Sequence, residues 1–240
     1  YDRKHSAINE YDFSKLDLKK LLSGYNWLHL SGITPALGEN CRNMIYDMMV
    51  CAKEMGITVS FDGNFRSTLW SWEEARDFCT KCLPYVDVLL GIEPYHLWKN
   101  EDDHCAGDIK DGIPLQSTAE QQDMIFRAFA EKYPNIKYIA RHIRYVHSGS
   151  ENSLKACLWY NGKTYESRLF TFSILDRVGG GDAFAAGLIY SIMHGWEPSE
   201  MINFAVAASV LKHTIHGDAN ITDDEQTIRG LMNMDLDIKR

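Results

Sequence analysis

The stretch that says most about the fold of this 240-residue chain is Asp176-Arg177-Val178-Gly179-Gly180-Gly181-Asp182-Ala183-Phe184-Ala185-Ala186-Gly187. Three glycines and one acid open a segment whose apolar, alanine-rich composition favours a helix. The preceding residues 168–175 are rich in aromatic and β-branched side chains, which is typical of a strand. A strand, a glycine turn and a helix start together aim free backbone N–H groups at an anion.

The acid at position 182 stands in the first turn of this expected helix. The helix dipole alone favours an acid there, so a tight turn with an N-terminal acid is the structural alternative. A carboxylate beside a bound phosphate is poorly suited to binding alone. It is well suited to taking a proton from a hydroxyl that attacks the phosphate. On local physics, the two interpretations stay open.

Composition and charge limit the classes of function. The net charge of −8 argues against nucleic acid or an anionic membrane as a partner, because both need a basic face. A hydrophobic content of 45% is ordinary for a globular protein with one sizeable core, so we expect a single domain over residues 1–240. No stretch approaches the roughly 20 apolar residues of a membrane span, and the first residues lack a signal-peptide core, so we expect a cytoplasmic protein.

The six cysteines are scattered, and only Cys79 and Cys82 have metal-ligand spacing. No second pair of this spacing exists, and both residues fall within residues 72–84, which have a helical pattern. Spacing of three places both thiols on one helical face. Reduced structural thiols are therefore favoured over a zinc or redox site.

Segments with strand and helix patterns alternate along the chain. Strands are expected at residues 26–31, 57–61, 86–90 and 136–140, a hairpin at 156–172, and helices at 39–55, 71–82, 118–132, 182–190, 201–213 and after 222. This alternation predicts an α/β fold with a mostly parallel sheet and helices on both of its faces.

Ligands of such sheets collect at the carboxyl ends of the strands. Several polar or glycine residues closely follow expected strands: Asp62, Asn64, Arg66, Glu93, Arg141 and Gly179–Asp182. The sequence therefore predicts that the chemistry lies along one edge of the sheet.

The run over residues 176–187 resembles the C-terminal signature of the ribokinase (PfkB) family of sugar kinases. The resemblance implies a ribokinase-like three-layer α/β/α sandwich. It also implies that Gly179, Gly180 and Gly181 form an anion hole for the transferred phosphoryl group, that Gly179 and Gly181 border the nucleotide, and that Asp182 is the catalytic base. Arg177 departs from the small residue most common at its position. With Arg177, the run over residues 176–182 instead resembles the branch of the family that phosphorylates 2-keto-3-deoxygluconate.

A second segment, Asp62-Gly63-Asn64-Phe65-Arg66 followed by Leu69-Trp70, resembles the Asp-x-Asn-x-Arg…Leu-Trp segment of that branch. Asn64 can donate to sugar hydroxyls, and Arg66 offers a planar fork for a carboxylate or phosphate. The alternative is that Asp62 and Asn64 only stabilise the turn after a strand.

A third motif, Tyr1-Asp2-Arg3 followed by Ser6-Ala7, resembles the Tyr-x-Arg…Ser-Ala motif of the same branch. The resemblance implies that Tyr1 and Arg3 hold the sugar acid. An arginine lets a kinase prefer a substrate with a carboxylate over a neutral sugar. The alternative is a solvated chain terminus.

Two further segments, residues 141–152 and 212–218, resemble the parts of the family that line the nucleotide. Arg141, Arg144 and His213 are the candidate nucleotide-binding residues there, and His213 is equally suited to a helix C-cap. The family's Asn-x-x-Glu motif, which organises magnesium, appears here as Gly91-Ile92-Glu93, so only Glu93 remains as an indirect ligand. The implied cofactors are ATP and Mg²⁺.

Family members usually carry a long region before the Tyr-x-Arg motif, with the first strands and a lid that often forms the dimer contact. Nothing in this chain matches that region, so we expect the 240 residues alone to be feebly active or inactive, and the intact protein to be a candidate homo-oligomer.

The resemblance implies an ATP-dependent kinase that phosphorylates a sugar acid, first of all 2-keto-3-deoxygluconate, to the 6-phosphate. Two alternatives stay open: another kinase of the family acting on fructose, ribose or a nucleoside, and a non-catalytic nucleotide-binding module. A nicotinamide dehydrogenase is disfavoured because no Gly-x-Gly-x-x-Gly follows an early strand.

Overall fold

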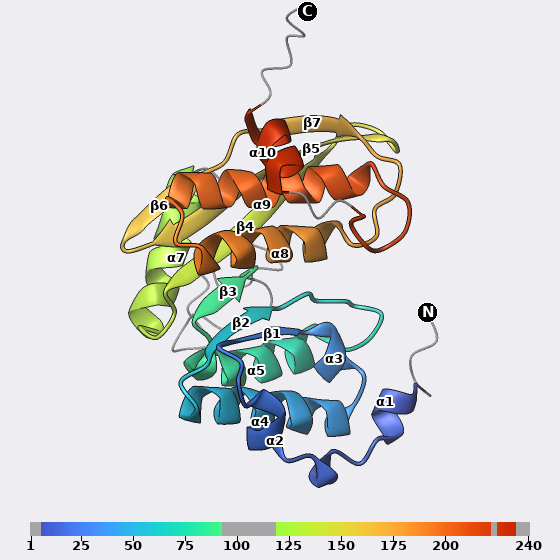
Figure 1. Cartoon of the computed structure of the whole chain (residues 1–240), viewed down its shortest axis with the longest axis vertical. Coiled ribbons are helices and arrows are strands. Elements are labelled where there is room, and N and C mark those ends of the chain that lie inside the picture. Colours follow the sequence, from blue (N-terminus) through green and yellow to red (C-terminus); the bar gives the residue numbers. More distant parts are fainter. Residues whose placement is uncertain (1–5, 93–118, 222–224, 234–240) are drawn as a thin grey trace, which may run out of the picture. The chain divides into compact units, whose positions relative to one another are not determined.

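A computed structural model describes residues 6–92, 119–221 and 225–233 of the chain (Figure 1). The chain divides into two compact units, one formed by Tyr1–Pro114 and Met124–Ala140, the other by Leu115–Asp123 and Arg141–Arg240. The expectation of one domain over residues 1–240 stays a prediction. In the described ranges, no helix has the length and apolar character needed to cross a membrane.

The first unit is built on parallel strands. β1 (Trp27–Ser31) pairs with β2 (Thr58–Asp62), β2 with β3 (Val88–Leu90), and β3 with the beginning of β4 (Tyr138–Val146). The register places Ser31 opposite Asp62, at the carboxyl ends of both strands. This confirms the parallel pairing that the alternation of strands and helices predicts.

The helices of the first unit begin and end at sequence signals. α4 (Glu39–Glu54) is followed by Gly56, whose φ of +73° favours glycine. α5 (Trp72–Cys82) begins with a capping box in which Ser71 and Glu74 bond to each other's backbone. Figure 1 shows α4 and α5 lying along the strands of this unit. The shorter elements are α1 (Ala7–Glu10), η1 (Phe13–Lys15), α2 (Leu18–Leu22), α3 (Ile33–Ala36) and η2 (Leu83–Tyr85).

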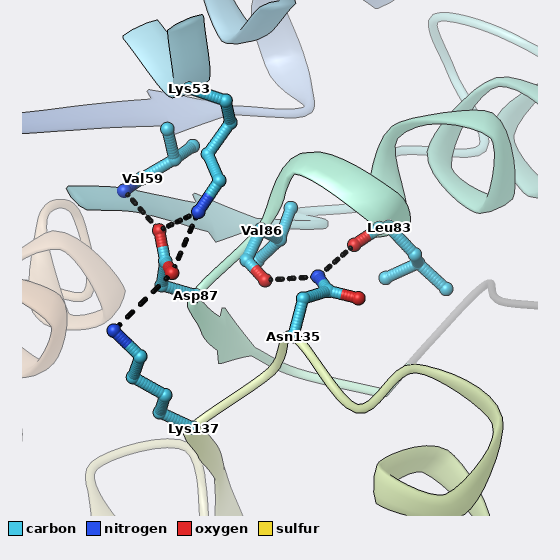
Figure 2. Close-up of polar contacts among 7 residues, drawn as sticks. All are labelled: Lys53, Val59, Leu83, Val86, Asp87, Asn135 and Lys137. Atoms are coloured by element: carbon cyan, nitrogen blue, oxygen red, sulfur yellow. Dashed lines mark hydrogen bonds and ion pairs between the residues drawn. The ribbon is translucent and has the colours of Figure 1, made fainter. Parts of the chain in front are cut away.

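A buried carboxylate ties the amino ends of these strands together (Figure 2). Asp87 accepts hydrogen bonds from Lys53 Nζ at 2.8 and 2.9 Å and from Val59 N at 2.9 Å. Lys137 Nζ lies 3.7 Å from the same carboxylate. Beside it, Asn135 Nδ2 donates to two backbone carbonyls, those of Leu83 at 2.8 Å and Val86 at 2.7 Å. We call this cluster of Asp87, Lys53, Val59, Lys137 and Asn135 the Asp87 knot. Each of its polar side chains has a hydrogen-bond or ion-pair partner.

The second unit carries the antiparallel part of the sheet. β5 (Glu151–Tyr160) pairs with β6 (Lys163–Glu166) and with β7 (Phe170–Ser173). The hairpin at Asn161-Gly162 is confirmed, but the predicted second arm consists of two short strands rather than one. β4 is also longer than expected, because the strand continues from Ala140 to Val146. α7 (Ala119–Lys132) belongs in part to each unit.

Three helices complete the second unit: α8 (Gly180–Met193), α9 (Pro198–His213) and α10 (Glu225–Asn233). α8 and α9 lie side by side (Figure 1). Their close approach depends on Gly187, because a Cβ there would stand 3.1 Å from the Cα of Ala205. α9 also packs on β5, and its residue Phe204 shares an apolar cluster with Ile228 of α10. The glycine turn is thus anchored at the start of a well-packed helix.

Candidate active site

The turn before α8 is shaped by two glycines that cannot be replaced without clashes. Gly179 is the N-cap of α8 and has a φ of +79°. A Cβ on Gly179 would lie 2.1 Å from the carbonyl oxygen of Asp218, and one on Gly180 would lie 2.3 Å from Cε1 of His213. These contacts explain why glycine occupies both positions.

The other side of this turn is open. Among the described residues, a Cβ on Gly181 would meet no atom within 4 Å, and Asp182 is exposed in the first turn of α8. Ala183 N donates to Gly179 O at 2.9 Å, and the N–H groups before it lack acceptors within the helix. The positive end of the helix dipole therefore faces open space beside a carboxylate, which suits a bound phosphate.

Asp176 clamps the turn to the loop that follows α9. Its Oδ1 accepts from Val178 N at 3.0 Å and its Oδ2 from Gly217 N at 2.9 Å. These backbone N–H groups, first that of Val178, hold the pKa of Asp176 below its usual value. Asp176 is not among the site residues predicted from the sequence, although an acid two residues before an expected turn is a known signal of this geometry.

The structure places His213 behind the turn rather than on its open side. Its side chain is fully buried, and its ring lies 5.1 Å from the ring of Phe172. Nδ1 donates to Ser209 O at 2.7 Å, and Ser209 Oγ donates to Gly180 O at 2.8 Å. Nε2 has no hydrogen-bond partner among the described residues. Burial lowers the pKa of His213, so the ring is held neutral behind Gly180. The predicted role of His213 in nucleotide binding would therefore be indirect and exerted through the glycine turn.

Arg141 and Arg144 lie within β4, so the expectation that Arg141 follows a strand is wrong. The strand continues because β5 lies beside it as a hydrogen-bonded neighbour in the sheet, which the sequence pattern did not reveal. Arg141 is buried and Arg144 is half-buried. Burial, together with the charge of Arg177, lowers the pKa of Arg144. A role of either arginine in nucleotide binding stays a prediction.

In the first unit, the residues after β2 form a tight polar turn. Asn64 has a φ of +38°, its N donates to Asp62 Oδ1 at 3.0 Å, and its Nδ2 donates to Ser31 Oγ at 3.2 Å. The structural interpretation of Asp62 and Asn64 thus has direct support. Arg66 is exposed at the end of this turn. Its exposed guanidinium suits a ligand, whereas the Asn64 amide also serves the turn.

Three predicted site residues, Tyr1, Arg3 and Glu93, lie outside the described residues. Among those described, no group of three or more His, Cys, Asp or Glu side chains could hold a metal ion. Burial raises the pKa of Cys79 well above its usual value and that of Cys82 to about 12, so both thiols stay protonated. The structural interpretation of these cysteines is thereby favoured.

Comparisons with known proteins agree on one family. Residues 149–225 match the pfkB family carbohydrate kinase pattern. A PfkB family carbohydrate kinase from Listeria grayi is 36% identical, with a TM-score of 0.82 over 97% of this chain and 68% of that one. A 2-dehydro-3-deoxygluconokinase from Thermotoga maritima is 35% identical, with a TM-score of 0.84 and the same coverage.

Curated relatives point the same way at lower identity. A 2-dehydro-3-deoxygalactonokinase from Haloferax volcanii is 28% identical over 100% of this chain and 67% of its own length. A 5-dehydro-2-deoxygluconokinase from Geobacillus thermodenitrificans is 23% identical over 77% of this chain and 49% of its own length. The chain thus spans about half to two thirds of these two relatives. With its ribokinase-like α/β fold, the chain belongs to the PfkB family of carbohydrate kinases.

Proposed function

We propose that the protein catalyses the ATP-dependent phosphorylation of a dehydro-deoxy sugar acid, first of all 2-keto-3-deoxygluconate at its terminal hydroxyl. The observation that carries the proposal is the open glycine turn, which presents helix N-terminal N–H groups beside the exposed carboxylate of Asp182. A site that only bound phosphate would gain nothing from a negative charge at that place. A phosphoryl transferase needs both groups.

Each part of the turn has a distinct task in this reaction. Asp182 accepts the proton of the hydroxyl as its oxygen attacks the γ-phosphorus of ATP, and the bond to the β,γ-bridging oxygen breaks. The N–H groups of Gly179, Gly180 and Gly181 stabilise the charge on the transferred group. Because His213 and Asp218 pack behind Gly180 and Gly179, the turn is held in shape before a ligand arrives.

The described residues fit a nucleotide phosphate better than a protein-bound metal. The open side of Gly181 leaves room for phosphate oxygens at the positive end of α8. Mg²⁺ would reach the site with ATP and neutralise phosphate charge there. Glu93 is the candidate to support it through water.

The choice of a sugar acid rests on the arginines and on the relatives. Arg66 is exposed after β2 and can pair with a carboxylate through its planar fork. Tyr1 and Arg3 are proposed to hold the same acid, and Asn64 a hydroxyl. The names of the Thermotoga maritima, Haloferax volcanii and Geobacillus thermodenitrificans proteins all denote kinases of dehydro-deoxy sugar acids.

The test measures ATP consumption by the protein as the cell produces it. Its substrates are 2-keto-3-deoxygluconate, its galactonate epimer, 5-keto-2-deoxygluconate, fructose and ribose. We expect the keto-deoxy acids to have the highest kcat/KM, and Arg66→Lys to reduce this preference. Preference for fructose or ribose would instead support a neutral-sugar kinase. ATP binding without turnover of any substrate would support a binding module.

A further inference from the structure

Lys212 is an unusual residue for the interior of a protein. It precedes His213 at the end of α9, and its side chain is fully buried. Lysine is almost never fully buried unless it is paired. Its Nζ donates to Ile215 O at 2.9 Å, and the described residues offer it no other hydrogen bond or ion pair. Since an ammonium has three N–H donors, this charge needs an explanation beyond packing.

The loop that Lys212 holds wraps around the glycine turn. His213 O accepts hydrogen bonds from Leu175 N at 2.8 Å and Asp176 N at 3.2 Å. Gly217 N donates to the carboxylate of Asp176, and Asp218 O lies against Gly179. Residues 212–218, which we call the support loop, therefore contact the turn at three successive places.

The charge of Lys212 also acts on the clamp between turn and loop. It contributes to lowering the pKa of Asp176, after the two backbone N–H groups that this carboxylate accepts. The positive charge of Lys212 thus stabilises two groups, the carbonyl of Ile215 and the carboxylate of Asp176. Without it, the carbonyl oxygen of Ile215 loses its partner and the charge on Asp176 is less well balanced.

We propose that Lys212 is a built-in cation that holds the support loop, and through it the glycine turn, in the shape that receives a nucleotide phosphate. Lys212 is a positioning residue, because its buried ammonium acts through Ile215 and Asp176 and touches no substrate. The inference rests on the proposed function only in taking the bound anion to be ATP. A monovalent cation that carbonyl oxygens accept, such as NH₄⁺, should replace a missing ammonium.

Two variants separate charge from packing. Lys212→Ala removes the charge and leaves a cavity, whereas Lys212→Met removes the charge and fills the space. ATP affinity is measured by titration calorimetry in NaCl and in NH₄Cl at equal ionic strength. In NaCl we expect both variants to bind ATP about tenfold more weakly than wild type. NH₄⁺ should restore most of this loss in Lys212→Ala but not in Lys212→Met. Wild type and the control Lys163→Ala, which loses an exposed lysine on β6, should bind ATP with the same affinity in NaCl and in NH₄Cl.

Wild-type ATP affinity in both variants would overturn the proposal, and so would a loss in Lys212→Ala that NH₄⁺ does not change. If the variants are too unstable for titration, the midpoint of thermal unfolding decides instead. NH₄⁺ should raise the midpoint of thermal unfolding in Lys212→Ala alone. An equal rise of the midpoint in Lys212→Met would contradict the proposal that Lys212 is a built-in cation. Because none of these measurements uses a sugar, failure of sugar phosphorylation in wild type rejects the proposed function and leaves this test intact.

Discussion

The Asp87 knot and the glycine turn use similar groups in opposite ways. The Asp87 carboxylate is buried and accepts from Lys53 Nζ and Val59 N (Figure 2). The Asp182 carboxylate is exposed, and the described residues offer it no hydrogen bond. Behind the turn, His213 keeps a buried nitrogen without a partner among them. The contrast teaches that paired polar groups hold the fold, whereas open ones mark where a ligand is expected.

The largest expected effect lies at the open carboxylate. Asp182→Asn removes the proton acceptor but keeps the size of the side chain. We expect kcat to fall about a thousandfold. ATP affinity and the unfolding free energy should stay near wild type, because Asp182 is exposed. Steady-state kinetics, calorimetry and urea unfolding check the three parts, and a variant with near wild-type kcat would remove Asp182 from the mechanism.

The paired carboxylate should show the opposite behaviour. Asp87→Asn leaves the N–H of Val59 and the ammonium of Lys53 with a weaker acceptor. We expect the free energy of unfolding to fall by about 2 kcal/mol, because Lys53 is partly exposed and can reach water. Turnover per folded molecule should not change. Asp12→Asn, at an exposed ion pair with Lys15, is the matched control and should change the stability by less than about 0.5 kcal/mol.

Two neighbouring glycines divide the turn into a packed and an open side. In Gly180→Ala the new methyl group would collide with the His213 ring, so we expect a loss of about 1–3 kcal/mol in stability. In Gly181→Ala the new methyl group meets no atom of the described residues within 4 Å, so this variant should keep or slightly raise the stability. It should nevertheless weaken ATP binding, because the methyl group occupies the space proposed for phosphate. Equal stability of the two variants would contradict this division of the turn.

The smallest effect is a pH dependence of stability from His213. Burial lowers the folded-state pKa of this ring below the usual value of about 6.5. The neutral His213 ring therefore makes its full contribution to the free energy of unfolding above pH 6.5. This contribution is lost as the pH falls through 6.5 toward the folded-state pKa. Urea unfolding between pH 7.5 and 5 should show a steeper decline for wild type than for His213→Gln. His216→Gln, at an exposed position of the same loop, should follow wild type.

Much of this architecture could be predicted from the sequence. The cap at Ser71, the glycine after α4 and the turn Asn161-Gly162 are local signals, and the structure confirms the elements that they delimit. The glycine run likewise predicted a helix directly after it, over residues 182–190, and α8 confirms that helix but begins two residues earlier, at Gly180. These predictions succeed because each depends on a few neighbouring residues.

Features that depend on distant partners could not be predicted in this way. The extension of β4 past Ala140 depends on its pairing with β5. The position of His213 depends on contacts with Gly180 and Phe172, which are far away in sequence. A lysine inside the apolar pattern of α9 was visible, but only the fold shows that its charge is buried.

Turnover per folded molecule with 2-keto-3-deoxygluconate and ATP, measured for wild type, Asp182→Asn and Asp87→Asn, tests the proposed phosphoryl-transfer site most directly. We expect Asp182→Asn to lose about three orders of magnitude in kcat at full stability, while Asp87→Asn turns over like wild type. Comparable turnover of the two variants would contradict the proposal that the glycine turn and Asp182 form the phosphoryl-transfer site.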